Sequence, residues 1–177
     1  WQVNTMTMPV LFFAAGLGTR MGAMTQNGPK PLIKVAGKAL IDHALDLTIE
    51  AGIDRKVVNL HYRSDMIRQH LAGHAIHYSD ETVALLETGG GLRKALPLLN
   101  GNPVLTMNTD AVWNGPNPVK HILRAWKPDM EALLLVVEKG NVSGHLGKGD
   151  FRIDADGRLH RAPKAIYTGL QIIRTDV

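Results

Sequence analysis

Hydrophobic positions along the first two thirds of the chain follow two alternating periods, one typical of strands and one typical of helices. Apolar runs at Val10–Ala15, Lys56–Leu60 and Val104–Met107 have the length of buried strands. Apolar residues recur at helical spacing from Leu40 to Ala51, and Gly52 supplies a helix stop. Strands and helices in alternation predict an α/β fold with a doubly wound, mostly parallel sheet and helices on both faces.

Several weaker segments complete this pattern. Ser64 is expected to cap a short helix, and a weak strand is predicted at Ala75–Tyr78. A loop is expected to end in Glu87–Gly91, before a short helix that starts at Leu92 and is limited by Pro97. The other predicted elements are a helix capped by Asn117 that runs from Pro118 to Trp126, a strand buried on both faces at Ala132–Val137, a hairpin with strands at Phe151–Ile153 and Arg158–His160, and a last strand at Ile166–Ile173.

The composition bounds the class of protein. With 177 residues, 45% of them apolar, the chain has enough material for one packed domain. No apolar run approaches the length of a bilayer span, and the absence of cysteine excludes disulfides and thiolate metal sites, which fits a cytoplasmic protein. The net charge of +4 comes from scattered cations without an aromatic platform, so we expect anionic small substrates, and neither nucleic acid nor membrane as a partner.

The stretch from Val10 to Leu32 holds the strongest candidate chemistry. A strand-like run breaks into a loop that contains glycines and the isolated cations Arg20 and Lys30. Loops of this kind place backbone N–H groups around a phosphate, because a residue without Cβ lets the backbone approach an anion closely. Prolines on both sides of Lys30 stiffen the backbone there, which favours a functional lysine over an ordinary surface cation.

Two familiar phosphate motifs do not match this stretch or the segment that follows it. The dinucleotide fingerprint fails because Met21 occupies the position of its third glycine. The P-loop fails because Gly37 and Lys38 are followed by Ala39, where serine or threonine is required. A dehydrogenase-like dinucleotide binder is therefore disfavoured.

The stretch contains instead Ala-Ala-Gly-x-Gly-x-Arg-Met from Ala14 to Met21, then Pro-Lys-Pro-Leu with the lysine ten residues after the arginine. This pattern resembles the signature of the sugar-1-phosphate nucleotidyltransferases. The resemblance implies a Rossmann-like nucleotide-diphospho-sugar transferase fold. It also implies an enzyme that transfers a nucleoside monophosphate from an NTP to a sugar 1-phosphate, depends on Mg²⁺ and releases pyrophosphate. We expect a monomer or a weak homo-oligomer.

The same resemblance gives roles to individual residues. Arg20 would be a catalytic residue that neutralises the pyrophosphate end of the triphosphate, and Lys30 would act near the reacting α-phosphate. Asp110 would hold Mg²⁺, and its alternative is a helix-capping or turn residue. The residues implied to bind the nucleotide are Ala15, Gly16, Leu17, Gly18, Thr19, Thr88, Gly89 and Gly90. The residues implied to bind the sugar phosphate are Asn108, Gly147, Asp150, Thr168 and Gly169.

Parts of these segments have plainer interpretations. The glycine triplet from Gly89 to Gly91 is also typical of a flexible turn. The segment from Gly147 to Asp150 is equally consistent with a solvated approach to the hairpin. Thr109 stands where the family commonly has glycine, which weakens the expectation that a sugar or ribose approaches closely there.

The segment from Glu87 to Leu99 looks most like the bacterial branch that uridylylates N-acetylmuramic acid 1-phosphate, and it therefore implies UTP as the nucleotide. Within the same class, a mannose-1-phosphate guanylyltransferase or a cofactor cytidylyltransferase remains open. A catalytically silent nucleotide-binding regulatory module on the same fold is an alternative from another class. Intact Arg20, Lys30 and Asp110 argue against that alternative.

The family resemblance also bears on the ends of the chain. A second metal ligand would follow the strand that contains Tyr167, Thr168 and Gly169, where too few residues remain to supply it. We therefore expect residues 9–177 to form a single nucleotidyltransferase domain that lacks its C-terminal segment. Residues 1–8 are expected to be a tag or a disordered N-terminal extension. Without a covering segment, Ile172 and Ile173 would be exposed on an edge strand.

Overall fold

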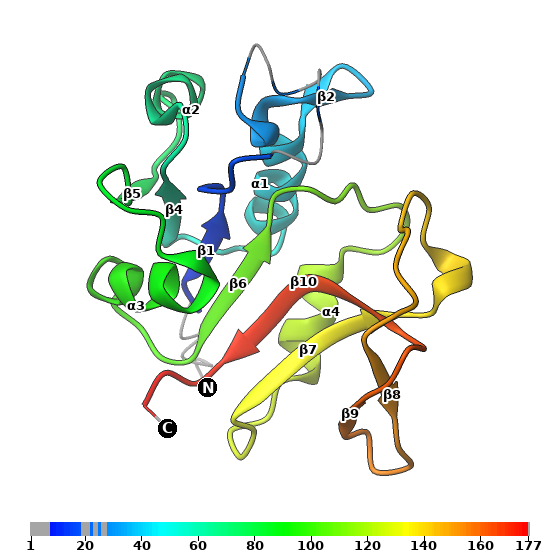
Figure 1. Ribbon diagram of the computed structural model, residues 1–177. Helices are drawn as coiled ribbons and strands as arrows, with labels where there is room; N and C mark the ends of the chain where they lie inside the picture. The colour runs from blue at the N-terminus through cyan, green and yellow to red at the C-terminus, as the bar shows by residue number, and fades with distance from the viewer. Residues whose placement is uncertain (1–7, 19–21, 23–24, 26–27, 177) are drawn as a thin grey trace.

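A six-stranded sheet organises the chain in the computed structural model, which describes residues 8–18, 22, 25 and 28–176 (Figure 1). The strands lie in the order β5-β4-β1-β6-β10-β7. The first four are mutually parallel, whereas β10 runs antiparallel to both β6 and β7. The sheet strands are β1 (Val10–Phe13), β4 (Lys56–Leu60), β5 (His77–Asp80), β6 (Val104–Asn108), β7 (Ala132–Val137) and β10 (Ile166–Ile173).

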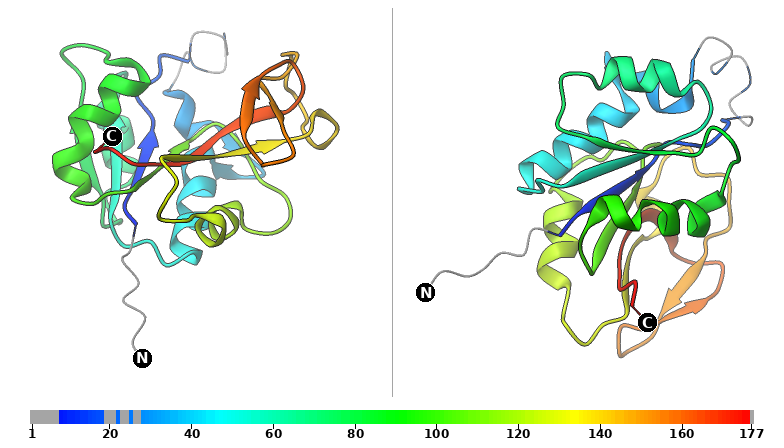
Figure 2. Two further views of the ribbon diagram at one scale, coloured as in Figure 1. Left: turned by 90° about the horizontal axis from the view of Figure 1, so that it is seen from below. Right: turned by 90° about the vertical axis from the view of Figure 1, so that its left-hand side faces the viewer.

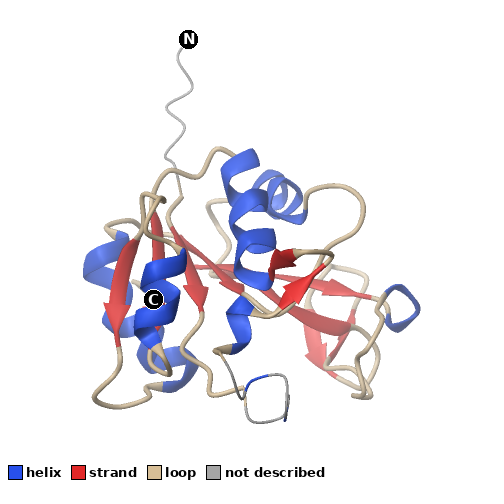
Figure 3. Cartoon of the chain, turned by 90° about the horizontal axis from the view of Figure 1, so that it is seen from above, coloured by secondary structure: helices blue, strands red, loops and turns tan. Residues whose placement is uncertain are grey.

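Helices cover both faces of this sheet (Figures 1 and 3). Three of them, α1, α2 and α4, contribute side chains to one core cluster, and α3 contributes to a second cluster on the opposite face. The four helices are α1 (Leu40–Glu50), α2 (Ser64–His70), α3 (Glu87–Leu99) and α4 (Pro118–Ala125). The predicted fold class, a doubly wound and mostly parallel sheet with helices on both faces, is confirmed.

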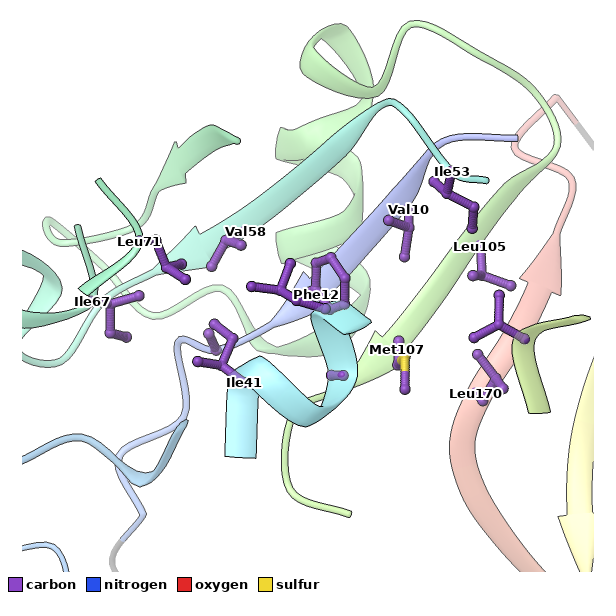
Figure 4. Close-up of a cluster of buried hydrophobic side chains, with 14 of the residues drawn as sticks. Val10, Phe12, Ile41, Ile53, Val58, Ile67, Leu71, Leu105, Met107 and Leu170 are labelled. Carbon is purple, nitrogen blue, oxygen red and sulfur yellow. The ribbon is translucent and has the colours of Figure 1, made fainter. Parts of the chain in front are cut away.

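The larger core lies between the sheet and α1, α2 and α4 (Figure 4). Successive side chains of a strand point to opposite faces of a sheet. Val10 and Phe12 of β1 therefore enter this core, while Leu11 packs under α3. All three side chains are fully buried. Burial of one such side chain stabilises the fold by about 1.5–3 kcal/mol, which fixes β1 at the centre of the sheet.

Short elements lie outside the sheet. The hairpin of β8 and β9 extends from the end of the sheet that β7 and β10 form (Figures 1 and 2). The hairpin was predicted, and its second strand begins one residue later than expected. The short elements are η2 (Lys30–Leu32), β2 (Lys34–Val35), β3 (Lys38–Ala39), η3 (Lys139–Asn141), β8 (Phe151–Ile153) and β9 (Leu159–Arg161). Within the described residues, no helix combines the length and the hydrophobicity needed to cross a membrane.

The predicted helix start at Leu92 is wrong. α3 begins at Glu87, includes the glycine triplet and continues through Pro97 to Leu99. A proline in the last turn removes only one backbone donor, and burial of Leu99 beyond it compensates for that loss. The interpretation of Gly89 to Gly91 as a flexible turn is therefore wrong as well, because these residues are helical.

Other boundaries and environments differ from the prediction. Ser64 is the first residue of α2, while Arg63 holds the cap position with a φ of 48°. The strand predicted to start at Ala75 begins at His77, where its pairing with β4 begins. β7 is an edge strand with partly exposed side chains, so it is not buried on both faces as predicted. Ile172, which was expected to be exposed, is fully buried because β10 lies between β6 and β7.

The predicted start of the fourth helix is confirmed in detail. The Asn117 side chain accepts hydrogen bonds from the N–H groups of Val119 and Lys120, at 2.9 and 3.2 Å. Pro118 is the first helical residue, where its missing N–H and fixed φ suit the helix. The expectation for residues 1–8 concerns a segment of which only Met8 is among the described residues.

Candidate functional site

A cavity of about 450 Å³ opens at the carboxyl ends of β1 and β6. The chain leaves β1 toward β4 on one side and leaves β6 toward β7 on the other. Strands whose connections diverge in this way form the crevice in which α/β proteins usually bind ligands. The lining residues are Phe13, Ala14, Ala15, Gly16, Leu17, Gly18, Lys30, Pro31, Asn59, Glu81, Leu85, Glu87, Thr88, Asn108, Thr109 and Asp110.

The glycine segment after β1 forms one wall of this cavity. A Cβ built at Gly16 would meet none of the described atoms within 4 Å, so the backbone there borders open space. Gly18 has a φ of +66°, and a Cβ on it would lie 2.9 Å from Cγ2 of Thr25 and 3.2 Å from Cβ of Lys30. The Thr25 hydroxyl lies within hydrogen-bond distance of the Gly18 carbonyl, at 3.3 Å, and of the Gly22 carbonyl, at 3.1 Å. Glycine at position 18 thus allows both the turn and the close approach of Lys30.

Lys30 and Asp110 meet across the cavity. The Lys30 ammonium donates to Asp110 Oδ2 at 2.6 Å, and the two side chains are 29% and 40% exposed. Lys30 begins η2 between Pro29 and Pro31, both of which are buried. An ion pair this exposed contributes only about 0–1 kcal/mol to stability. The pair therefore adds little to the stability of the fold, although it holds a cation and a carboxylate beside the glycine segment. Charged groups placed in a cavity without a large effect on stability are typical of a ligand site.

Asn59 and Glu81 were not among the site residues predicted from the sequence. They are 2% and 0% exposed and lie in the floor of the cavity. Asn59 Oδ1 accepts hydrogen bonds from the N–H groups of Ala14 and Ala15 at 2.7 and 3.1 Å, and Asn59 Nδ2 donates to Glu81 Oε1 at 2.9 Å. The strand predicted to reach Ala15 ends at Phe13, because the next two N–H groups turn toward this side chain.

A signal for these two residues exists in the sequence. Asn59 is a polar residue inside the otherwise apolar end of the strand Lys56–Leu60, and Glu81 follows directly after a strand. Buried polar groups are nearly always hydrogen-bonded. A polar side chain within a buried strand therefore indicates a partner elsewhere in the chain, although it does not identify that partner.

The first turn of α3 forms another wall of the cavity. Glu87 and Thr88 line the cavity, while Gly89 and Gly90 follow in the same turn but lie outside its lining. Glu87 has a φ of +59°, a conformation that a residue with a Cβ adopts only at a cost of about 1–3 kcal/mol. Strain of this kind is common at ligand sites. The free N–H groups at this end of the helix also carry a partial positive charge, which suits an anion.

The residues predicted to bind a sugar phosphate differ in whether they line the cavity. Asn108 lines the cavity, and Gly169 of β10 packs so closely against the Asn108 side chain that a Cβ would overlap it. Thr168 donates from its hydroxyl to the Leu135 carbonyl at 2.8 Å, within a register shift of β10. Gly147, Asp150, Thr168 and Gly169 are not among the residues that line the cavity.

The Asp150 carboxylate accepts from the N–H of Tyr167 at 2.9 Å, and this bond attaches the approach to the hairpin to β10. Gly147 is exposed in the loop before it. Burial raises the pKa of the Tyr167 hydroxyl to about 12, so this group stays protonated at ordinary pH and cannot act as a base.

Among the residues predicted to bind the nucleotide or to act in catalysis, most converge on the cavity. Ala15, Gly16, Leu17, Gly18 and Thr88 line it together with Lys30 and Asp110. The Ala15 N–H already binds Asn59, so this group is not available to a phosphate. Thr19 and Arg20 lie outside the described residues.

Thr109, the departure from the usual family pattern, has a clear local role. Its side chain is 3% exposed, and its hydroxyl donates to the Phe13 carbonyl at 2.9 Å. The bond joins the ends of β1 and β6. The hydroxyl group is thus turned toward β1, and both Thr109 and the adjacent Asp110 line the cavity.

The fit of a magnesium ion depends on Asp110. No cluster of three or more His, Asp or Glu side chains that could hold a metal occurs among the described residues. Mg²⁺ in nucleotide sites commonly takes only one or two carboxylates and completes its shell with phosphate oxygens and water. A single exposed carboxylate at a strand end fits that mode of binding. It does not fit a metal site built from protein ligands alone.

Comparison with known proteins identifies the family. Residues 10–153 match the MobA-like NTP transferase domain, and the chain belongs to that family. It is 37% identical to the N-acetylmuramate alpha-1-phosphate uridylyltransferase of Caulobacter vibrioides, over 94% of this chain and 75% of the relative. A relative of the same name from Neisseria meningitidis serogroup B is 41% identical over 59% of this chain and 48% of the relative. The predicted resemblance to sugar-1-phosphate nucleotidyltransferases is confirmed.

A solved structure supports the fold. UDP-glucose pyrophosphorylase complexed with UDP-glucose superposes with a TM-score of 0.75 at 18% identity, over 97% of this chain and 77% of the other. At that identity the likeness shows a shared fold. The predicted Rossmann-like nucleotide-diphospho-sugar transferase fold is confirmed.

Proposed function

We propose that this protein transfers UMP from UTP to a sugar 1-phosphate of the muramic or glucosamine type, with release of pyrophosphate. The observation that carries the proposal is the Lys30–Asp110 pair beside the glycine segment, in a chain 37% identical to a uridylyltransferase over 94% of its length. The position of the cavity at the carboxyl ends of β1 and β6 adds support.

The chemistry requires positioning and charge neutralisation. The second pKa of a phosphate monoester is near 6, so the attacking sugar phosphate is largely a dianion at pH 7 and needs no general base. One of its oxygens bonds to the α-phosphorus of UTP while the bond from that phosphorus to the bridging oxygen breaks, and pyrophosphate leaves. Lys30 is proposed to stabilise charge at the α-phosphate, and Arg20 charge on the leaving pyrophosphate.

Asp110 is the side chain proposed to hold Mg²⁺, together with phosphate oxygens of the substrate. When bound, the ion supplies additional positive charge to the triphosphate. Lys30 would then exchange its carboxylate partner for a phosphate oxygen. Because the pair is exposed, this exchange costs little free energy.

The proposal is tested by measuring pyrophosphate release for four nucleoside triphosphates against a panel of sugar 1-phosphates. The panel includes the 1-phosphates of N-acetylmuramic acid, N-acetylglucosamine, glucose and mannose. We expect the highest kcat/KM with UTP and an N-acetylated amino sugar, and no release when EDTA removes Mg²⁺. Preference for GTP with mannose 1-phosphate would support a guanylyltransferase instead. Nucleotide binding without turnover in any combination would support a silent regulatory module.

A further inference from the structure

We propose that Asn59 and Glu81 act as positioning residues that hold the two walls of the nucleotide cavity at a fixed separation. This inference rests on the proposed function, since it assigns to the pair an effect on nucleotide affinity. Neither side chain is exposed enough to be a principal ligand contact, at 2% and 0%. Both nevertheless lie in the floor of the cavity.

The hydrogen bonds of the pair connect the walls directly. On one side, Asn59 Oδ1 accepts from the N–H groups of Ala14 and Ala15, which begin the glycine segment. On the other side, Glu81 Oε2 accepts from the N–H of Leu86 at 3.2 Å, just before α3 begins. The Asn59–Glu81 bond of 2.9 Å joins these two halves. One chain of hydrogen bonds therefore runs from the glycine segment to the start of α3.

The order of donors and acceptors in this chain determines which side chains can form it. Both ends are backbone N–H groups, which can only donate. Asn59 must present its oxygen to Ala14 and Ala15, so its NH₂ group faces residue 81. The side chain at 81 then has to accept at both of its oxygens, which a carboxylate does and an amide does not. An amide at one of the two positions and a carboxylate at the other therefore allows every hydrogen bond of this chain to form.

The helix packs tightly over the pair. A Cβ built at Gly91 of α3 would lie 2.7 Å from Glu81 Oε1 and 3.0 Å from Asn59 Nδ2. The backbone of α3 thus approaches the pair as closely as a glycine allows. The Glu81 backbone is fixed as well, since its N–H donates to the Leu60 carbonyl at 2.7 Å and its carbonyl binds His61 Nδ1 at 2.6 Å.

The experiment reverses the hydrogen-bond polarity of the pair. Glu81→Gln alone places an NH₂ group against another donor, and Asn59→Asp alone places two carboxylates together. The double variant Asn59→Asp with Glu81→Gln restores the chain, because a carboxylate at position 59 can accept from Ala14, Ala15 and the new amide, whose oxygen accepts from Leu86. We expect Glu81→Gln to raise the KM for UTP about tenfold, and the double variant to recover it to within about threefold of wild type. The KM for the sugar 1-phosphate should remain unchanged.

Amide hydrogen exchange gives a second readout that needs no substrate. In the wild type, the amides of Ala14, Ala15 and Leu86 should exchange far more slowly than that of Gly16. Glu81→Gln should accelerate exchange at Leu86 or at Ala14 and Ala15. Thr48→Val is the matched control, because Thr48 is a buried polar residue of α1 whose hydroxyl donates to the Leu45 carbonyl and which does not line the cavity. It should lower stability and leave the KM for UTP unchanged.

The outcomes separate this inference from the proposed function. Exchange at Ala14 and Ala15 as fast as at Gly16 in the wild type would overturn the positioning role, whether or not the protein is active. A KM for UTP in Glu81→Gln equal to wild type would overturn it too, as would a folded double variant with no recovery. Failure of wild-type turnover with every substrate pair would instead contradict the proposed function, while the exchange measurement still decides the role of the pair.

Discussion

At the scale of single residues, solvent access separates the two polar pairs of the site. Water screens the charges of Lys30 and Asp110, so a phosphate can displace that contact at a cost of only about 0–1 kcal/mol. The bonds of Asn59 and Glu81 are shielded from water, where an unsatisfied donor or acceptor costs about 1–3 kcal/mol. The exposed pair is therefore suited to meet a ligand, and the buried pair to hold the wall behind it.

Replacement of the Lys30 ammonium tests the first of these roles. Lys30→Ala should lower kcat by about 10²–10³, the usual loss on removal of a preorganised charge stabiliser. The free energy of unfolding should change by less than about 1 kcal/mol, because the ion pair is exposed. Lys38→Ala is a matched control, since Lys38 pairs with Asp46 on the surface and does not line the cavity. Equal turnover of the two variants would show that Lys30 has no role in the reaction.

Asp110→Asn tests the metal role of the carboxylate. The amide keeps the shape of the side chain but loses the charge that would hold Mg²⁺, so turnover should fall to background at millimolar Mg²⁺. Circular dichroism should show an unchanged sheet. A magnesium titration of UTP binding by calorimetry measures the effect without turnover. Wild-type activity at ordinary Mg²⁺ would make Asp110 a turn residue and place the metal elsewhere.

The sequence allowed part of this site to be predicted. Lys30 was predicted from the motif that contains it and Asp110 from its position after a strand, and both line the cavity, where the fold brings them within 2.6 Å across 80 residues of sequence. Asn59 and Glu81 carry no such local motif. Their roles depend on partners in three separate segments, and only the packed sheet brings those partners together.

At the scale of elements, α3 has two functions that constrain its sequence differently. Its first turn lines the cavity, and its later turns pack against β1, β4 and β5. A glycine in the interior of a helix ordinarily costs about 0.5–1 kcal/mol relative to alanine. The triplet from Gly89 to Gly91 therefore lowers the intrinsic stability of the helix. Whether glycine is needed at each position depends on the atoms that pack against it.

Two alanine substitutions in the triplet should have opposite effects. Gly91→Ala should destabilise the fold by about 1–3 kcal/mol, because its Cβ would press on Glu81 and Asn59. Gly89→Ala should be neutral or stabilising by up to about 1 kcal/mol, because its Cβ would meet none of the described atoms within 4 Å. Urea unfolding of both variants provides the comparison. A Gly91→Ala variant more stable than wild type would show that α3 can move away from the pair.

The turn between β5 and α3 should lose its stabilisation in acid. Hydrogen bonds from the hydroxyl and N–H of Thr82, with a smaller contribution from Arg68, lower the pKa of Asp80 from 3.8 to about 2. Since the pKa is lower in the folded state, the stabilisation is complete above about pH 4 and is lost as the pH falls toward 2.

Thr82→Ala should therefore raise the pKa of Asp80 toward 3.8, because it removes the largest of these contributions. A carboxyl-carbon NMR titration measures the shift. Asp176 is an internal control, since Arg174 and Asn102 lower its pKa to about 2 without any contribution from Thr82. An Asp80 titration identical to wild type would mean that the backbone N–H of residue 82 or Arg68 holds the pKa down instead.

The limits of prediction at this scale have physical causes. Elements with strong periodicity or clear caps were predicted with nearly correct bounds. Examples are the helix Leu40–Glu50 and the helix that Asn117 caps. The start of α3 was misplaced because glycines and a proline have low helix propensity, which tertiary packing overrides. The exposure of β7 and β10 was misjudged because the antiparallel insertion of β10 beside β6 leaves no local signal.

At the scale of the whole molecule, the cavity draws on nearly every parallel strand. Its residues lie at or just beyond the carboxyl ends of β1, β4, β5 and β6, so a ligand that occupies it contacts segments nearly 100 residues apart in sequence. Such a site exists only when the sheet is assembled. A nucleotide that binds the native protein and not the unfolded chain must therefore stabilise the whole fold.

This coupling gives a test of nucleotide choice that does not depend on catalysis. At a concentration 100-fold above its Kd, a nucleotide adds about 2.7 kcal/mol to the unfolding free energy, which corresponds to a rise in Tm of about 5–10 °C for a chain of this size. At equal concentrations with Mg²⁺, UTP should raise Tm more than GTP, and Lys30→Ala should reduce the rise. A larger effect of GTP would favour the guanylyltransferase alternative. A rise in Tm with UTP, combined with no release of pyrophosphate from UTP in the presence of any sugar 1-phosphate, would identify a binding module that has lost catalysis. No rise with any nucleotide would contradict the assignment of the cavity itself.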